Sequence, residues 1–335
     1  MATEVSQTLI SDGQNVFIDP SCASRQDTIG VNLSTTRQYG QVDMCTANAL
    51  NATVGAGSLT LGAGLSFGQF KTAMRIANFT LSSTSGTTNI EIDSPKVENA
   101  IAKAYEDATM SFQCTVYHDI GSAIDFRLVA LSADAENDFS TATAIETGSD
   151  VSVADVTATV LKLENVSMGD VSNGFALRVQ VETGDVTTKN IYVTDWSGVK
   201  GAKAQPVQPY DVNEHLIRIK RRLNYMNFDQ ESGEEIIDGC RAIDTNTMVG
   251  TLNYPEMDTN PDTGFTSTES ASGTFLAVGP VSSAAGDSKT FSLASRRSMK
   301  MQLNTLGTPF TAGHAGAIRR NATQTCWLKI DSRLV

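Results

Sequence analysis

The chain has 335 residues, 40% of them hydrophobic, which is enough for one large or two modest hydrophobic cores. Its net charge of −12 argues against a nucleic-acid partner, because binding to phosphates requires a cationic surface. No stretch approaches the ~18–20 apolar residues of a membrane-spanning helix, so we expect no membrane insertion.

The cysteines are odd in number and far apart, with no CxxC pair and no Cys/His cluster. This spacing signals neither a disulfide framework nor a zinc site. We therefore expect free thiols and folding in a reducing cytoplasm. The N-terminal residues, which lack the pattern of a signal peptide, agree with this expectation. Cys114 lies in an alternating apolar run and is predicted to be a small buried hydrophobe. The five cysteines are Cys22, Cys45, Cys114, Cys240 and Cys326.

Residues 1–13 are polar and unpatterned, which indicates an arm rather than a core element. From Asn15 onward, short apolar runs alternate with turn-forming residues, a pattern typical of an antiparallel β-sandwich. The clearest strand is 175–182, in which every second residue is apolar. Further strands are predicted at 72–81, 89–93, 110–116, 125–131, 151–163 and 188–196.

The glycine-rich segment 55–68 lacks the GKS or GKT ending of a phosphate-binding loop. We therefore predict a flexible loop beside a strand. A short helix is predicted after Pro95, where Val97, Ile101 and Ala104 share one face.

A second, amphipathic helix is predicted at 211–226, within a connecting segment 206–228. Asp211 can cap its first turn, and Glu214 completes a capping box three residues later. Apolar residues recur at helical spacing as far as Leu223 and Met226. The arginines and lysine of its last turns indicate a solvated face or salt-bridge partners rather than a nucleic-acid site.

Residues 229–335 predict a smaller β-rich domain with polar loops. Its strand-like pieces lie at 246–252, 273–279, 289–294, 298–303 and 324–330.

The sequence shows no convergent set of titratable groups, so we predict no catalytic residue, no metal and no cofactor, and therefore no enzyme. The histidines, His118, His215 and His314, lie far apart, and no GxSxG or HExxH motif is present. Carboxylate pairs such as Asp134 with Glu136, or Glu234 with Glu235, keep a glycosidase open as a less favoured alternative.

One strand carries the candidate ligand site. Tyr192, Thr194 and Trp196 alternate with Ile191 and Val193, so the two large aromatic residues are predicted to share a face. An exposed Tyr192 and Trp196 would form a binding platform or a subunit contact. Buried, they would belong to the core, which is favoured because large aromatic side chains are mostly buried.

Five short segments, at residues 14–19, 92–112, 191–206, 221–225 and 328–334, resemble in this order a jelly-roll module of tailed-bacteriophage fibres and virion proteins. Residues 14–19 resemble its opening "N-L-L-I-N-G-D-F", and residues 92–112 resemble its "Q-R-I-E-N … L-A-G-K-T-V-T-L-S-F-W". Residues 191–206 are similar to its "F-Y-I-T-x-V-Q-L-E-x-G-x-x-A-T-P-F", and residues 221–225 stand where it has "L-x-x-C-Q-R-Y-Y". Residues 328–334 resemble its closing "A-D-A-E-L" strand. The chain departs from the module in having Met44-Cys45 and Gln113 at positions where tryptophans are common.

The resemblance implies a mainly β chain with a carbohydrate-binding-module-like jelly-roll sandwich at 14–205. A short helix in the connecting segment 206–228 and a second small β-rich domain at 229–335 would follow it. It implies a non-enzymatic virion protein made in the host cytoplasm, a tail-fibre or appendage component for host adsorption. The chain would form a homotrimer, bind other virion proteins through the arm at residues 1–13, and bind a host-surface glycan. A structural capsid-decoration or head-fibre protein is the alternative, and a glycan-degrading spike is the second alternative.

Overall fold

The computed structural model describes residues 15–24, 31–69, 71–84, 87–208 and, in the C-terminal part, 223–227, 235–253, 266–267, 275–278, 283–292, 298–305, 315–320 and 327–331. The chain divides into two compact units. The first comprises Met1–Leu216 with Leu334–Val335, and the second comprises Ile217–Arg333. The predicted arm, residues 1–13, lies outside the described residues.

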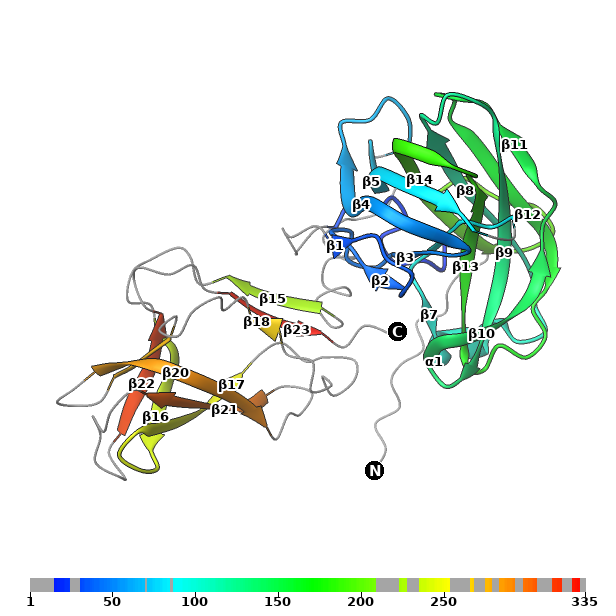
Figure 1. The fold of residues 1–335 in the computed structure, drawn as a ribbon. Helices are drawn as coiled ribbons and strands as arrows, with labels where there is room; N and C mark the ends of the chain where they lie inside the picture. Colours follow the sequence, from blue (N-terminus) through cyan, green and yellow to red (C-terminus); the bar gives the residue numbers. More distant parts are fainter. Residues whose placement is uncertain are drawn as a thin grey trace. The chain divides into compact units, whose positions relative to one another are not determined.

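The first unit is a jelly-roll β-sandwich, as predicted, with two antiparallel sheets (Figure 1). The six-stranded sheet has, in spatial order, β1 (Val31–Asn32), β4 (Ala52–Ala63), β5 (Thr72–Ser83), β14 (Val186–Lys200), β8 (Thr109–His118) and β12 (Thr159–Ser167).

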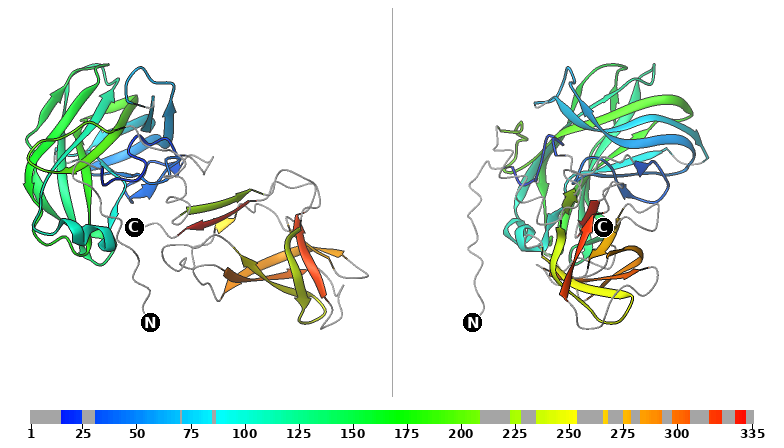
Figure 2. Two further views of the ribbon diagram at one scale, coloured as in Figure 1. Left: turned by 180° about the vertical axis from the view of Figure 1, so that it is seen from behind. Right: turned by 90° about the vertical axis from the view of Figure 1, so that its left-hand side faces the viewer.

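The eight-stranded sheet forms the second layer, and Figure 2 shows both layers from behind and from the side. Its order is β10 (Asp138–Thr147), β9 (Ile124–Ala135), β13 (Gly174–Glu182), β6 (Ile90–Asp93), β3 (Thr46–Ala49) and β2 (Gln38–Tyr39), with β11 (Val151–Val153) paired to β9 and β7 (Val97–Glu98) paired to β13.

One hydrophobic core lies between the two sheets. The apolar positions of the predicted strand 175–182 are buried in it, and they face side chains such as Phe112 and Val116 from the opposite sheet. Cys114 is fully buried among them, so its prediction as a small core residue is confirmed. The alternation of the sequence is therefore the alternation between core and outer face.

A short helix after Pro95 is confirmed, but its predicted start and face are wrong, because Val97 lies in the strand β7 and Ala104 is exposed. The helical segment itself is brief. It consists of α1 (Asn99–Ala102) and a 3-10 turn, Lys103–Tyr105, which follows directly. Ala102 and Tyr105 are buried and join the core.

The prediction of a loop at 55–68 is wrong over most of its length, because residues 55–63 belong to the twelve-residue strand β4. This strand pairs with β5 along its whole length, and Gly55 and Gly57 lie close against that neighbour. A Cβ atom at Gly57 would come within 2.9 Å of Phe79. The glycines thus serve close packing of a strand rather than loop flexibility.

Residues 15–24 pack against β14. The backbone N–H of Val16 donates to the carbonyl of Gly198 over 3.0 Å, and Phe17 enters the core. The sulfur atoms of Cys22 and Cys45 lie 3.6 Å apart, and both residues are buried. Among the described residues, Cys22, Cys45, Cys114 and Cys240 are buried and form no disulfide, in agreement with the prediction, and Cys326 lies outside those residues.

The second unit holds a closed barrel and a three-stranded sheet. The barrel runs through β16 (Glu235–Ala242), β17 (Thr247–Asn253), β21 (Ser298–Thr305), β20 (Ser283–Ser292), β19 (Phe275–Val278) and β22 (Ala315–Arg320). The sheet has the order β15 (Leu223–Asn227), β23 (Trp327–Asp331) and β18 (Thr266–Ser267).

The helix predicted at 211–226 is wrong at its C-terminal end. Leu223–Asn227 form the strand β15, which pairs with β23 in a register that sets Leu223 opposite Asp331. Leu223 and Met226 fit a helical spacing, but pairing with a strand about a hundred residues later overrides that local pattern. Residues 209–222, the remainder of the predicted helix, lie outside the described residues.

Candidate functional site

A row of side chains crosses four strands on the outer face of the six-stranded sheet. Tyr192 on β14 is the register partner of Arg75 on β5 and of Tyr117 on β8, and Arg75 is in turn the partner of Thr60 on β4. Directly paired residues point to the same side of a sheet. All four are partly exposed, whereas the next residue along β14, Val193, is fully buried in the core. The row therefore faces away from the core.

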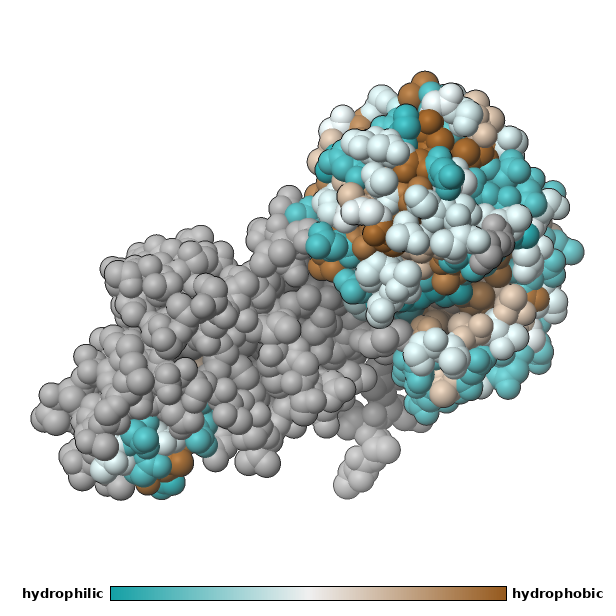
Figure 3. Space-filling view, viewed as in Figure 1, coloured by the Kyte–Doolittle hydropathy of each residue, from teal (hydrophilic) through white to brown (hydrophobic). Residues whose placement is uncertain are grey.

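Phe67, from the segment after β4, completes a cluster with the two tyrosines. Its ring stacks on Tyr117 with centroids 4.6 Å apart and meets Tyr192 edge-on at 5.8 Å. The two tyrosine rings are 5.5 Å apart and also meet edge-on. We call Phe67, Tyr117 and Tyr192 the aromatic surface. Figure 3 shows how hydrophobic residues are interspersed with hydrophilic ones on one face of this unit.

Glycines make room for this cluster. A Cβ atom at Gly62 would lie 3.1 Å from the Tyr192 ring, which is tighter than most packing contacts. Gly68 has a φ of +78°, and a Cβ atom there would lie 3.0 Å from the methyl group of Thr194. The glycine-rich composition of 55–68 was thus a signal of the site, since it lets the backbone and Phe67 approach β14 closely.

Polar groups flank the aromatic surface at both ends. At one end the Nε of Arg75 donates to Oγ1 of Thr60 over 2.9 Å. At the other end the Asp119 carboxylate accepts from the backbone N–H and the side-chain Nδ2 of Asn190, both over 2.6 Å.

Tyr117 keeps its proton at neutral pH. Partial burial raises the pKa of its phenol, and the charge of Asp119, the Tyr192 hydroxyl and the charge of Asp155 raise it further. The phenol is therefore a hydrogen-bond donor as well as a ring surface.

Trp196, the second predicted site residue, does not share a face with Tyr192. The register of β14 against β8 skips between Thr194 and Ser197, and Asp195 has a φ of +54°. This β-bulge shifts the alternation by one residue, so Trp196 is fully buried in the core while Tyr192 is partly exposed. Tyr192 and Trp196 therefore do not form a common surface. The rings that lie beside Tyr192 in the aromatic surface are those of Phe67 and Tyr117.

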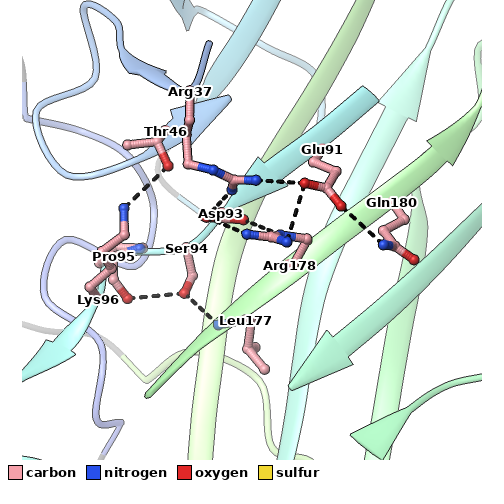
Figure 4. A network of polar contacts seen from close by, with 10 residues as sticks. All are labelled: Arg37, Thr46, Glu91, Asp93, Ser94, Pro95, Lys96, Leu177, Arg178 and Gln180. Atoms are coloured by element: carbon pink, nitrogen blue, oxygen red, sulfur yellow. Dashed lines mark hydrogen bonds and ion pairs between the residues drawn. The ribbon is translucent and has the colours of Figure 1, made fainter. Parts of the chain in front are cut away.

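A second polar cluster, on the outer face of the eight-stranded sheet, is shown in Figure 4. Arg37 pairs with Glu91 over 2.5 Å and also with Asp93. Arg178 pairs with Asp93 over 2.8 Å and with Glu91 over 3.2 Å. Gln180 donates to Glu91 over 3.1 Å. We call the four ionised residues the charge network.

The electrostatics of the charge network indicate a structural role. Burial by itself raises the pKa of Asp93, but Arg37 and Arg178 outweigh this effect and lower the pKa from 3.8 to about 2. The side chains of Glu91 and Asp93 are only 7% and 2% exposed. Since the arginines and carboxylates already satisfy one another, this cluster joins strands rather than presenting groups to a ligand.

Nearby, Lys96 is buried as well. Its Nζ donates to Oγ1 of Thr46 over 3.2 Å and lies 5.1 Å above the Tyr39 ring. Burial lowers the pKa of Lys96 to about 8, with Arg37 adding to the effect and Asp93 opposing it. Its contacts are thus internal too.

His118 is buried and fully engaged, so it is not poised as a base. Its Nε2 lies 3.0 Å from the carbonyl oxygen of Val153, and its Nδ1 accepts from the backbone N–H of Ile120 over 3.3 Å. The ring stacks on Phe126 with centroids 5.7 Å apart. His215 and His314 lie outside the described residues.

The predicted carboxylate pair Asp134 and Glu136 is exposed, and each makes its own contact. Asp134 accepts from Oγ1 of Thr143 over 2.8 Å, and Glu136 accepts from Nδ2 of Asn99. The side chains of 234 and 235 lie outside the described residues. In the described part of the chain, no group of three or more His, Cys, Asp or Glu side chains could hold a metal ion. Within that same part, no helix is long and apolar enough to cross a membrane.

No protein-family model and no curated protein matches the chain. Solved structures do, at low similarity, and they include carbohydrate-binding modules. The C-terminal family 22 carbohydrate-binding module of Clostridium thermocellum Xyn10B is 17% identical, with a TM-score of 0.31, covering 46% of this chain and 89% of that one. A CBM4 structure is 14% identical, with a TM-score of 0.30, covering 57% of this chain and all of that one (100%).

The CBM22-1–GH10 modules of the Clostridium thermocellum endo-1,4-β-D-xylanase 10B, complexed with xylohexaose, are also similar, with 10% identity and a TM-score of 0.32. The match covers 50% of this chain but only 27% of the xylanase chain. Similarity at these TM-scores does not identify a ligand for this chain.

Proposed function

We propose that the first unit is a carbohydrate-binding module and that it binds its ligand at the aromatic surface. The observation that carries the proposal is the set of three partly exposed rings, Phe67, Tyr117 and Tyr192, with polar groups at both ends. The apolar C–H face of a sugar ring packs on aromatic rings, and a few polar groups at the margins orient its hydroxyls.

We further propose that the module binds without cleaving its ligand. The two carboxylates near Tyr117 are already engaged, since Asp119 accepts two hydrogen bonds from Asn190 and Asp155 accepts one from the backbone N–H of Gly121. A glycosidase would instead need two free carboxylates on either side of the scissile bond. Incubation with a bound polysaccharide tests this point, and a fall in its viscosity or the release of reducing ends would contradict it.

Isothermal titration calorimetry, with ligands chosen from a glycan array, tests the binding site. Tyr192→Ala removes the central ring, and we expect a Kd about tenfold or more weaker. Tyr192→Phe is the matched control, because it keeps the ring and loses only the hydroxyl, and it should retain most of the affinity. A third variant, Thr141→Ala, changes an exposed residue on β10 of the other sheet and should bind like the original chain. A blank array with folded protein, or equal affinity of Tyr192→Ala, would overturn the proposal.

We propose that the module serves in a virion, as a homotrimeric tail-fibre or appendage component that adsorbs to a host-surface glycan. The support is the ordered sequence resemblance, together with the binding surface of the first unit. A decoration or fibre protein on the capsid is the alternative context, favoured by the missing tryptophans at residues 45 and 113. Antibody labelling of particles in electron microscopy separates tail from capsid, and sedimentation of the purified chain tests the trimer. A chain that is a monomer both in solution and in the virion would contradict the proposed trimer.

A further inference from the structure

We infer that the aromatic surface selects an anionic glycan, a sugar bearing a carboxylate, and that Arg75 is the residue that binds the acid group. This inference rests on the proposed function, because it names the class of ligand for the same site. It follows from the position of Arg75, from its free donors and from the charges around it.

Arg75 stands directly beside the central ring. It is the register partner of Tyr192 on the neighbouring strand, and both side chains lie on the outer face. Such partners are about 5 Å apart across a sheet. A sugar ring has a similar width, so a sugar stacked on Tyr192 brings its ring substituents within reach of the guanidinium.

The guanidinium is oriented but not neutralised. Its Nε donates to Oγ1 of Thr60 over 2.9 Å, which leaves the donors of its two terminal nitrogens. Within the described ranges no carboxylate pairs with Arg75, whereas Arg37, Arg127 and Arg178 all pair with carboxylates there. Among the described residues, Arg75 therefore stands beside the aromatic surface without a carboxylate partner to compete with a ligand.

A carboxylate is the anion that this geometry favours. The planar guanidinium fork matches the two oxygens of a carboxylate, and Lys does not reproduce that match. At the opposite end of the platform the charges of Asp119 and Asp155 act on Tyr117. These carboxylates repel an acid group and accept hydrogen bonds from hydroxyls. The ligand is therefore oriented, with its acid group toward Arg75 and its hydroxyls toward Asp119.

Calorimetry with matched ligands tests the inference. The probes are oligogalacturonate and oligoglucuronate, each compared with its methyl ester, which keeps the sugar and removes the charge. We expect the acid form of at least one probe to bind about tenfold or more tightly than its ester at low salt, with the difference shrinking as salt rises. Equal affinities for acid and ester in both pairs would overturn the inference.

Variants of Arg75 make the test specific. Arg75→Gln should abolish the preference for the acid, so that acid and ester bind with equal affinity, and Arg75→Lys should retain only part of the preference. A melting temperature equal to that of the original chain shows that a variant is folded. An acid preference that survives in Arg75→Gln would overturn the role of Arg75. Neutral glycans that bind at Tyr192 without any acid preference would defeat this inference alone, and a chain that binds no glycan would defeat the proposed function as well.

Discussion

Replacement of Asp93 by asparagine is the most direct test of the charge network. The side chain of Asp93 is 2% exposed and pairs with both Arg37 and Arg178. Asparagine has almost the same shape and keeps one acceptor oxygen, so the packing is preserved while the charge is lost. The two arginines then share only Glu91 as a counter-charge within the network, which destabilises the folded state.

The pKa of Asp93 gives the magnitude of the effect. A fall from 3.8 to about 2 corresponds to about 2 kcal/mol, at about 1.36 kcal/mol per pKa unit. Since the folded-state pKa lies below the unfolded one, this stabilisation is fully present above pH 4. It is lost as the pH falls through about 2, where the folded carboxylate takes up its proton. Asp93→Asn should therefore cost about 2–3 kcal/mol at pH 7 and less at pH 3.

Urea unfolding followed by circular dichroism at pH 7 and pH 3 measures both quantities. Asp107→Asn is the matched control. Asp107 is exposed, and its φ of +54° suits asparagine, so its replacement should change stability by less than about 0.5 kcal/mol. Equal unfolding midpoints for Asp93→Asn and the original chain at pH 7, or a difference that does not shrink at pH 3, would refute the reasoning.

Three further predictions concern residues around β14 and the core. Burial raises the pKa of Asp19 to about 7, so its contribution to stability falls as the pH rises from about 4 to about 7. In thermal melts between pH 4 and pH 8, the melting temperature of Asp19→Asn should lack this decrease with pH. Gly198→Ala would place a Cβ atom 2.9 Å from the Phe17 ring, and urea unfolding should show a loss of about 1–3 kcal/mol, with an unchanged midpoint counting against tight packing there. The sulfurs of Cys22 and Cys45 are 3.6 Å apart, but both residues are fully buried, and burial raises the pKa of the Cys45 thiol well above its usual value. Hydrogen peroxide should therefore join them into a disulfide, with release of water, far more slowly in the folded chain than in urea; mass spectrometry should show the loss of two hydrogens, and Cys45→Ala should not form the bond.

The β-sandwich was predictable from the order of amino acids alone. Strands such as 110–116 and 175–182 were predictable because each has one buried and one outer face, and this difference is written locally as alternation between apolar and polar residues. The burial of Cys114 followed from the same alternation.

Tertiary structure alone decided the composition of the candidate site. The bulge at Asp195 moves Trp196 into the core, and alternation along an assumed regular strand cannot reveal an extra residue. Phe67 and Tyr117 meet Tyr192 from segments far away in the sequence, so no local pattern joins them. The same holds for the charge network and for the strand at 223–227, whose pairing partners lie scores of residues away. Local patterns fix which face of a strand is buried, but which side chains become neighbours depends on contacts that only the folded chain creates.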